Sequence, residues 1–194
     1  YWIHHGLLTI NGQKMSKSLG NFVTINDFME KYKNADLLKM FFLSAHYSHP
    51  IDYTEEKIEE AKRAYERIII MLKRVDDIFN NIDYMQKDRI AKDATKNNQF
   101  EYIRSRFKEA MDDNFNTPQA LAVLQGLVTD MNITITQYPQ ILNHEISLQQ
   151  LYCSSYIFMP EVAKILGLDL EESLEMSKYL DAEIEDLIGK RNEA

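Results

Sequence analysis

The sequence is poor in cysteine and has no long apolar run. Cys153 is its only cysteine among 194 residues, which excludes an internal disulfide framework and suits a reducing compartment. No apolar stretch approaches the roughly 20 residues of a membrane-spanning helix. The first residues, from Tyr1 to His5, also lack the basic stretch and apolar core of a secretory signal. We therefore expect a cytoplasmic protein with no membrane partner.

Two further absences concern nucleotides and nucleic acids. No glycine-rich run ends in Gly-Lys-Ser or Gly-Lys-Thr, which excludes a P-loop. The net charge is −8, whereas a stand-alone nucleic-acid binder usually carries positive charge. Residues 1–50 hold five lysines against three acidic residues, a net charge of +2, so residues 51–194 carry −10. The second part alone is expected to bind RNA weakly.

A short lysine-rich segment is the most informative feature present. It reads Lys14-Met15-Ser16-Lys17-Ser18 and lies between Gly12 and Gly20. A triphosphate needs localised cations for its outer oxygens and hydrogen-bond donors between them. Two lysines three residues apart supply the cations, two serines supply donors, and the glycines let such a loop move. The segment predicts a polyphosphate-binding loop, and the alternative is a solvated basic turn.

Several segments resemble the class I aminoacyl-tRNA synthetases, and within that class the cysteinyl-tRNA synthetases. The run from Lys14 to Phe22 is similar to the signature loop of the class. Weaker similarity continues to Arg191. The choice of cysteine depends on three other segments: Trp2-x-His4-x-Gly6, Ser44-Ala45-His46-Tyr47 followed by Asp52-Tyr53, and the run Ala110 to Pro118.

The resemblance implies an ATP-dependent ligase that forms cysteinyl-adenylate and then charges tRNA(Cys). Its substrates would be cysteine, tRNA(Cys) and ATP with Mg²⁺. Lys14 and Lys17 would be the catalytic residues. The ATP-binding set would be Lys14, Met15, Ser16, Lys17, Ser18 and His4, where a strand-packing role for His4 stays open.

The resemblance also implies that parts of the family's chain are missing. Members carry a His- and Gly-rich signature and zinc ligands ahead of the segment that matches Tyr1, and they continue beyond Ala194. We therefore expect an internal fragment that needs a missing N-terminal catalytic domain, has its Zn²⁺ ligands outside this sequence, and is inactive alone. Two alternatives remain: a related cysteine ligase of mycothiol synthesis, and a non-catalytic helical RNA-binding or interaction module.

The rest of the pattern is mainly α. Asn11-Gly12 favours a tight hairpin turn after the strand-like run Gly6 to Ile10. Helices are predicted from Thr24 to about Tyr32, capped by Thr24 with Asp27, and after Asn34 as the next cap. A long amphipathic helix is predicted from Thr54, with one apolar stripe. The stripe is Ile58, Ala61, Tyr65, Ile68, Leu72, Val75 and Phe79.

Further helices are predicted beyond a polar stretch, 80–98, that is expected to be a turn or loose connection. The first of them carries the residues from Phe100 to Met111. The second starts with Thr117 as its cap and Pro118 at its first position. A third is capped by Ser147, and a shorter one starts or kinks at Pro160 and ends at Gly167. A last helix is expected over 181–191. The pattern predicts a short strand or hairpin with connector helices in residues 1–50 and an antiparallel helical bundle in residues 51–194. The resemblance implies that the first part is the end of a class I catalytic domain and that the second is a truncated bundle of the anticodon-binding DALR type.

Other candidate sites are weaker. His46 and His49 lie three residues apart, but no third metal ligand is evident, so no metal site is predicted. Asp112, Asp113 and Asn116 have the residue types of an acid-base or metal site, and capping and turn formation are the favoured roles. Cys153 is expected to be a buried small side chain rather than a reactive thiol.

Overall fold

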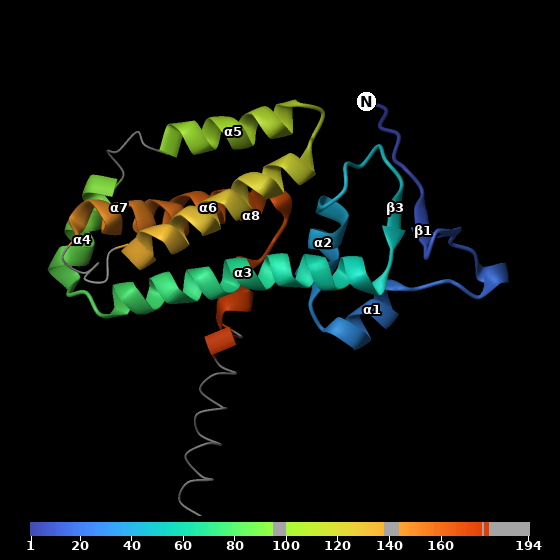
Figure 1. The fold of residues 1–194 in the computed structure, drawn as a ribbon, viewed down its shortest axis with the longest axis horizontal. Helices are drawn as coiled ribbons and strands as arrows, with labels where there is room; N and C mark the ends of the chain where they lie inside the picture. The colour runs from blue at the N-terminus through green and yellow to red at the C-terminus, as the bar shows by residue number, and fades with distance from the viewer. Residues whose placement is uncertain (95–99, 138–143, 176, 179–194) are drawn as a thin grey trace, which may run out of the picture. The chain divides into compact units, whose positions relative to one another are not determined.

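The computed structural model describes residues 1–94, 100–137, 144–175 and 177–178. It is mainly helical with one small sheet, which confirms the predicted fold class (Figure 1). Contacts divide the chain into two compact units. Unit 1 comprises Tyr1–Glu66 and Asn98–Thr129, and unit 2 comprises Arg67–Asn97 and Asp130–Ala194. No helix in the described ranges is long and apolar enough to cross a membrane.

The sheet of unit 1 has three short strands in the order β2-β1-β3. Strands β1 (Leu8–Ile10) and β2 (Gln13–Lys14) form the predicted hairpin. Asn11 and Gly12 both have positive φ, 49° and 75°, as a primed turn requires. Strand β3 (Ile51–Tyr53) pairs with β1 in parallel and was not predicted, because three residues after Pro50 give too short an alternation.

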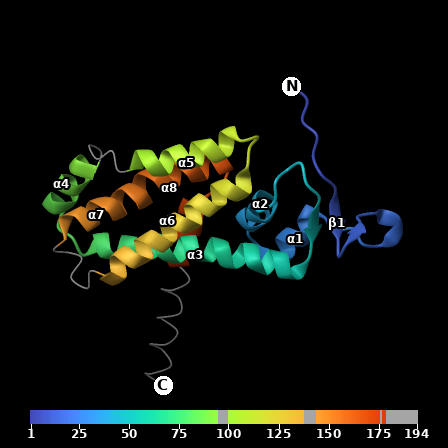
Figure 2. The same cartoon turned by 45° about the horizontal axis from the view of Figure 1, so that its top comes forward.

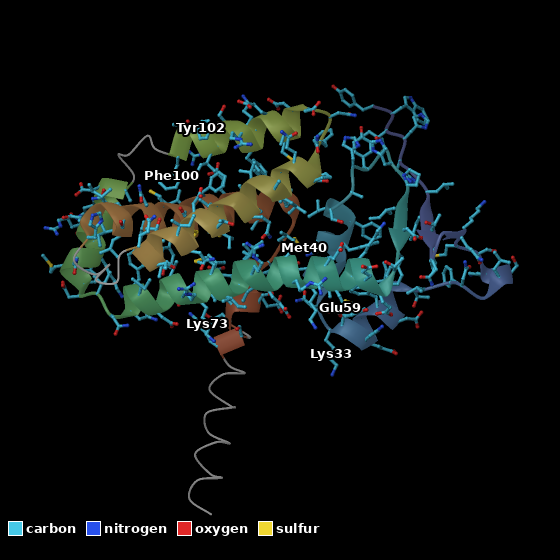
Figure 3. All side chains as sticks on the ribbon, viewed as in Figure 1. Lys33, Met40, Glu59, Lys73, Phe100 and Tyr102 are labelled. Carbon is cyan, nitrogen blue, oxygen red and sulfur yellow. The ribbon has the colours of Figure 1, made fainter. Side chains whose placement is uncertain are left out.

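Two capped helices connect β1 and β3. Helix α1 (Ile25–Tyr32) starts with the predicted capping box, in which Thr24 and Asp27 each accept a hydrogen bond from the other's backbone N–H. It ends at Lys33, whose φ is 51° and whose side chain projects outward (Figure 3). Helix α2 (Ala35–Leu43) is capped by Asn34, also as predicted.

The long helix α3 (Glu55–Asn80) confirms the prediction from Thr54. All seven residues of its predicted stripe are buried. In unit 1, the buried Asp36 of α2 accepts hydrogen bonds from Lys39 Nζ at 2.7 Å and Tyr65 Oη at 3.0 Å. Tyr65 lies on α3, so this contact fixes α2 against α3.

Helices α5 (Glu101–Asp112) and α6 (Thr117–Gln137) confirm two further predictions, with one correction. Thr117 is the first residue of α6 and not its cap. The cap is Asn116, whose Oδ1 accepts a hydrogen bond from the Gln119 backbone N–H at 3.2 Å. An asparagine one residue earlier satisfies the same orphan N–H group that a threonine cap would satisfy.

In unit 2, α4 (Tyr84–Ala94) and α7 (Glu145–Tyr152) lie side by side (Figure 1, Figure 2). The prediction of a turn or loose connection over 80–98 is therefore wrong for most of that stretch. Helix α4 has few apolar residues, but Ile90 and Ala94 are four apart and both fully buried. Packing of this narrow stripe outweighs the polar composition.

Helix α7 continues through the π-helical segment η4 (Cys153–Phe158) into α8 (Met159–Leu166). We attribute η4 to Pro160, because a proline inside an α-helix clashes with the carbonyl four residues earlier. The predicted end at Gly167 is confirmed, with φ of 72°.

The predicted Ser147 cap of α7 is wrong. His144 is the cap, and its Nδ1 accepts from the Ser147 backbone N–H at 3.4 Å and contacts Ser147 Oγ at 2.7 Å. Cys153 is buried as expected, and its Sγ donates to the Ala94 carbonyl. The predicted helix over 181–191 lies outside the described residues.

Candidate functional site

The hairpin that presents the lysine loop is fixed by one carboxylate of β3. Asp52 Oδ1 accepts a hydrogen bond from Thr9 Oγ1 at 2.6 Å and from the Gly12 backbone N–H at 2.8 Å. These two hydrogen bonds hold the pKa of Asp52 below its usual value, and the Thr9 hydroxyl has the larger effect. Both contacts favour the ionised carboxylate. Asp52 therefore joins the strand and the turn of the hairpin to the neighbouring strand.

The lysine loop, residues 14–18 of the sequence, follows directly from the hairpin. Strand β2 ends at Lys14, and a 3₁₀ turn, η1 (Lys17–Leu19), comes after Ser16. Gly20 closes this turn with φ of 68°, and its N–H donates to the Lys17 carbonyl at 3.2 Å. The side chains of Lys14, Lys17 and Ser18 are exposed, whereas Met15 and Ser16 are half-buried.

Asn21 links the two sides of the loop. Its Oδ1 accepts a hydrogen bond from the Ser16 backbone N–H at 2.8 Å, and its Nδ2 donates to the Lys14 carbonyl at 3.1 Å. The Ser16 and Ser18 hydroxyls bond each other at 2.7 Å. Lys17 Nζ lies 5.4 Å from the centre of the Phe22 ring, a cation–π contact.

An apolar cavity of about 460 Å³ adjoins the loop. Met15 from the loop and Phe22 after it contribute to the wall, together with Ile10 of β1 and Phe28 of α1. Met15 thus points its apolar side chain inward while the lysines on either side remain exposed. An apolar residue at position 15 is therefore suited to its place facing the cavity, while the lysines of the loop face solvent.

The charge on the loop is uncompensated within the described part of the chain. No carboxylate there forms an ion pair with Lys14 or Lys17. Two ammonium groups and two hydroxyls lie on one short segment. Such a segment can bind an anion with several oxygens, such as a polyphosphate.

His4 lies in an extended segment ahead of β1 and is exposed. It is therefore outside the strand, and its role in ATP binding stays a prediction. Two residues later, Gly6 approaches the backbone of the loop before β3 so closely that an added Cβ would lie 2.0 Å from the His49 carbonyl oxygen. The Gly6 N–H also donates to the Tyr47 carbonyl at 2.8 Å.

Three segments that carry the synthetase resemblance meet at Tyr47. Gly6 bonds its backbone, and Tyr47 Oη donates to Asn114 Oδ1 at 2.7 Å. Asn114 and the exposed Phe115 belong to the turn between α5 and α6, and both have left-handed φ, 54° and 53°. Residues far apart in the sequence thus gather beside the strand that leads to the lysine loop.

The other candidates have structural roles. The His46 and His49 rings pack edge to face, and His46 Nδ1 lies 2.7 Å from Ser48 Oγ. Among the described residues, no group of three or more His, Cys, Asp or Glu side chains is placed to hold a metal ion. Asp113 accepts a hydrogen bond from Asn116, the cap of α6, so the favoured turn and capping roles are confirmed for these two residues.

Sequence reasoning gave no role to Asn21 and Asp52. Asn21 stood within the signature run, and Asp52 stood within a resemblance segment, but neither pattern indicates a hydrogen-bond partner. A polar residue that follows a glycine at the end of a loop is a usable signal for Asn21. Asp52 needed the parallel pairing of β3 with β1, which local sequence does not reveal.

Comparisons with known proteins match two parts of the chain to family models. Residues 1–63 match the class I (C) tRNA synthetase catalytic domain, and residues 106–171 match the DALR domain. The cysteine–tRNA ligase of Bacillus velezensis is 38% identical over 198 residues, which is 100% of this chain and 38% of the relative. That of Thermodesulfovibrio yellowstonii is 34% identical over 203 residues, 100% of this chain and 40% of the relative.

A third relative, the cysteine–tRNA ligase of Sulfurihydrogenibium sp., is 43% identical over 133 residues, 69% of this chain and 26% of the relative. A solved ternary complex of Agrobacterium radiobacter LeuRS with tRNA and LeuAMS matches with a TM-score of 0.55 at 18% identity, which indicates a shared fold. That match covers 84% of this chain and 21% of the LeuRS chain. The chain spans between 26% and 40% of the length of the three ligases described.

Proposed function

Because this chain belongs to the cysteine–tRNA ligases, a family of class I tRNA synthetases, we propose that it works as part of an ATP-dependent enzyme that attaches cysteine to tRNA(Cys). The chain would supply the mobile loop that meets the ATP phosphates and helices that face the tRNA. Residues outside this sequence would supply the remaining part of the catalytic domain. Such an enzyme would work in the cytoplasm, together with tRNA and ATP.

The observation that carries this proposal is that both ammonium groups of the lysine loop are exposed and form no ion pair with a described carboxylate. In the first step, a carboxylate oxygen of cysteine attacks the α-phosphorus of ATP. The bond from that phosphorus to the bridging oxygen breaks, and pyrophosphate leaves with the electron pair. Negative charge therefore grows on the pyrophosphate, where Lys17 and Lys14 would stabilise it without transferring a proton.

The frame of the loop supports this role. Asp52 fixes the hairpin at Thr9 and Gly12, so Lys14 starts from a defined position. Lys17 follows on the 3₁₀ turn, and its amine lies over the face of the Phe22 ring. A polyphosphate offers Lys17 a full negative charge in place of an aromatic ring, which favours movement of the amine to the ligand.

In the second step, a terminal ribose hydroxyl of tRNA attacks the carbonyl carbon of cysteinyl-adenylate, and AMP leaves. The match of residues 106–171 to the DALR domain supports a role for this helical part in facing tRNA. Mg²⁺ would arrive with ATP as part of the substrate. The zinc ion expected in the family would need ligands outside the described residues, which gather no metal site.

The relatives argue against the mycothiol alternative. The three described above are cysteine–tRNA ligases, and two of them align with the whole of this chain, including its helical part. Exposed lysines also bind RNA phosphates, so a non-catalytic RNA-binding or interaction module is separated from the ligase by cysteine-dependent pyrophosphate exchange, which only the ligase would catalyse.

The test uses the complete ligase that contains this chain. We expect cysteine-dependent exchange of pyrophosphate into ATP, followed by cysteine attachment to tRNA(Cys). Exchange without attachment to any tRNA would indicate a different acceptor, such as an amino sugar. Absence of exchange, with ATP and cysteine both shown to be intact, would refute the proposed function.

A further inference from the structure

The side chain of Asn21 joins the two ends of a short segment, Lys14 to Ser16, at the start of the lysine loop. The Ser16 N–H can only donate and the Lys14 carbonyl can only accept, so one amide group with both functions is needed between them. This pair of partners also fixes which amide atom faces which neighbour. Aspartate would lack the donor, and alanine would lack both contacts.

The chain is folded back to bring Asn21 to this place. After Lys17, the 3₁₀ turn η1 and the left-handed Gly20 reverse the chain direction, and the Gly20 N–H closes the turn on the Lys17 carbonyl. Asn21 comes next and bonds Lys14 and Ser16. The backbone of the loop is thus closed on itself by hydrogen bonds, while the lysine side chains remain exposed.

The contacts made by the other loop side chains are ones that a polyphosphate can replace. The Ser16 and Ser18 hydroxyls bond each other, and Lys17 Nζ lies over Phe22. Phosphate oxygens accept hydrogen bonds from hydroxyls and from ammonium groups more strongly than these neighbours do. The two hydrogen bonds of the Asn21 side chain are made to backbone groups of the loop. We therefore expect them to stay in place when the ligand binds.

We propose that Asn21 is a positioning residue that holds the lysine loop as one body, so that Lys14 and Lys17 reach the leaving pyrophosphate together. This inference rests on the proposed function. Without Asn21, the loop backbone gains freedom, and part of the free energy of phosphate binding is spent on ordering it. The effect is expected mainly in the step where charge develops on the pyrophosphate.

The experiment compares Asn21→Ala and Asn21→Asp in the complete ligase with the control Asn80→Ala, an exposed asparagine at the end of α3. Cysteine-dependent pyrophosphate exchange is expected to fall roughly tenfold in kcat for Asn21→Ala, with little change in the KM for cysteine. Asn21→Asp keeps the acceptor for the Ser16 N–H and loses the donor to the Lys14 carbonyl. Its kcat should therefore lie between the kcat of the wild type and that of Asn21→Ala. The control should match the wild type.

A second readout follows the loop directly and needs no activity. Trypsin cleaves after lysine, and we expect cleavage after Lys14 and Lys17 to be about tenfold faster in Asn21→Ala, because the lost hydrogen bonds hold the loop closed. Slower exchange together with faster cleavage at these two lysines supports the proposal. An unchanged kcat or an unchanged cleavage rate overturns it. If the wild type shows no exchange at all, the proposed function fails, and the trypsin comparison still decides whether Asn21 holds the loop.

Discussion

At the residue scale, two kinds of residue stand at the lysine loop: those whose hydrogen bonds hold its backbone, and the lysines for which we propose a role in phosphate binding. Asp52 and Asn21 form hydrogen bonds with backbone groups or a neighbouring hydroxyl and hold the frame of the loop. Lys14 and Lys17 make no ion pair with the described residues and remain free to meet an anion. The two kinds of residue should therefore fail differently when they are replaced.

The first prediction concerns Lys17. In the complete ligase, Lys17→Ala should slow adenylate formation by roughly a hundred- to a thousandfold, the usual effect of removing one group that stabilises transition-state charge. Cysteine binding should change little, because the amine would interact with the leaving pyrophosphate. Pre-steady-state adenylate formation measures the effect, and Lys33→Ala, an exposed lysine at the end of α1, is the control. An unchanged adenylation rate would refute the role of Lys17.

The second prediction concerns pH. The pKa of Asp52 is lowered by the Thr9 hydroxyl and the Gly12 N–H, so its folded value is below the unfolded value of about 3.9. Its ionised form therefore adds stability above about pH 4, and this contribution is lost as the pH falls through the folded pKa. Asp52→Asn should lose less stability than the wild type between about pH 4.5 and pH 2.5. Urea unfolding at a series of pH values measures the difference. Glu30→Gln, which removes an exposed carboxylate of α1, should behave like the wild type.

At the element scale, the sheet depends on a close approach that only a glycine permits. Gly6 precedes β1 and lies against the backbone of His49 and Pro50, just ahead of β3. The contact continues in the hydrogen bond from the Ile51 N–H to the Leu7 carbonyl at 3.0 Å. The parallel pairing of β1 and β3 starts at this point, and the hairpin with its loop follows from β1.

The third prediction tests this approach with two glycines of unit 1. Gly6→Ala should lower the free energy of unfolding by about 3 kcal/mol, because the added carbon meets backbone atoms that cannot rotate away. Gly126→Ala, in α6, meets no atom within 4 Å and should instead raise it by about 0.5–1 kcal/mol. Urea midpoints of the 194-residue chain give both values. Equal effects of the two substitutions would show that the close contact at Gly6 is not maintained in solution.

Sequence reasoning predicted several elements whose signal is local, although its local cap predictions at Thr117 and Ser147 were wrong. The Asn11-Gly12 turn, the Thr24 capping box and the stripe of α3 are patterns of a few neighbouring residues, and the structure has all three. It failed where stability comes from distant partners. Helix α4 is formed around two buried residues that pack in unit 2, and β3 exists only because β1 lies beside it. At the candidate site, the roles of Lys14 and Lys17 stay a prediction, and the hydrogen bonds of Asn21 and Asp52 were not predicted.

At the scale of the whole molecule, the compact units do not follow the order of the chain. Each unit combines two separate stretches, and two of the three boundaries fall inside α3 and α6. The predicted division into residues 1–50, the end of a class I catalytic domain, and residues 51–194, a helical bundle of the DALR type, stays a prediction. The family models match residues 1–63 and 106–171.

The fourth prediction follows from the share of the ligases that this chain spans. The 194-residue chain by itself should catalyse no cysteine-dependent pyrophosphate exchange, because the role proposed for its loop, neutralising the leaving group, does not include binding of the amino acid. The complete ligase, assayed beside it at the same concentration, should be active. Exchange by the 194-residue chain that disappears on Lys17→Ala would show that this chain contains a whole active site.

The hydrogen bond from the Gly12 N–H to Asp52 also bears on how the protein ages. Asn-Gly pairs deamidate when the glycine nitrogen attacks the asparagine side-chain carbonyl carbon and ammonia leaves, and hydrolysis of the resulting ring gives aspartate or isoaspartate. Asp52 keeps the Gly12 nitrogen occupied, and the primed turn fixes its direction. Isoaspartate at position 11 would lengthen the backbone just before the lysine loop. On prolonged storage at mildly alkaline pH, mass spectrometry should find isoaspartate there sooner in Asp52→Ala than in the wild type, and equal rates would contradict this protective role.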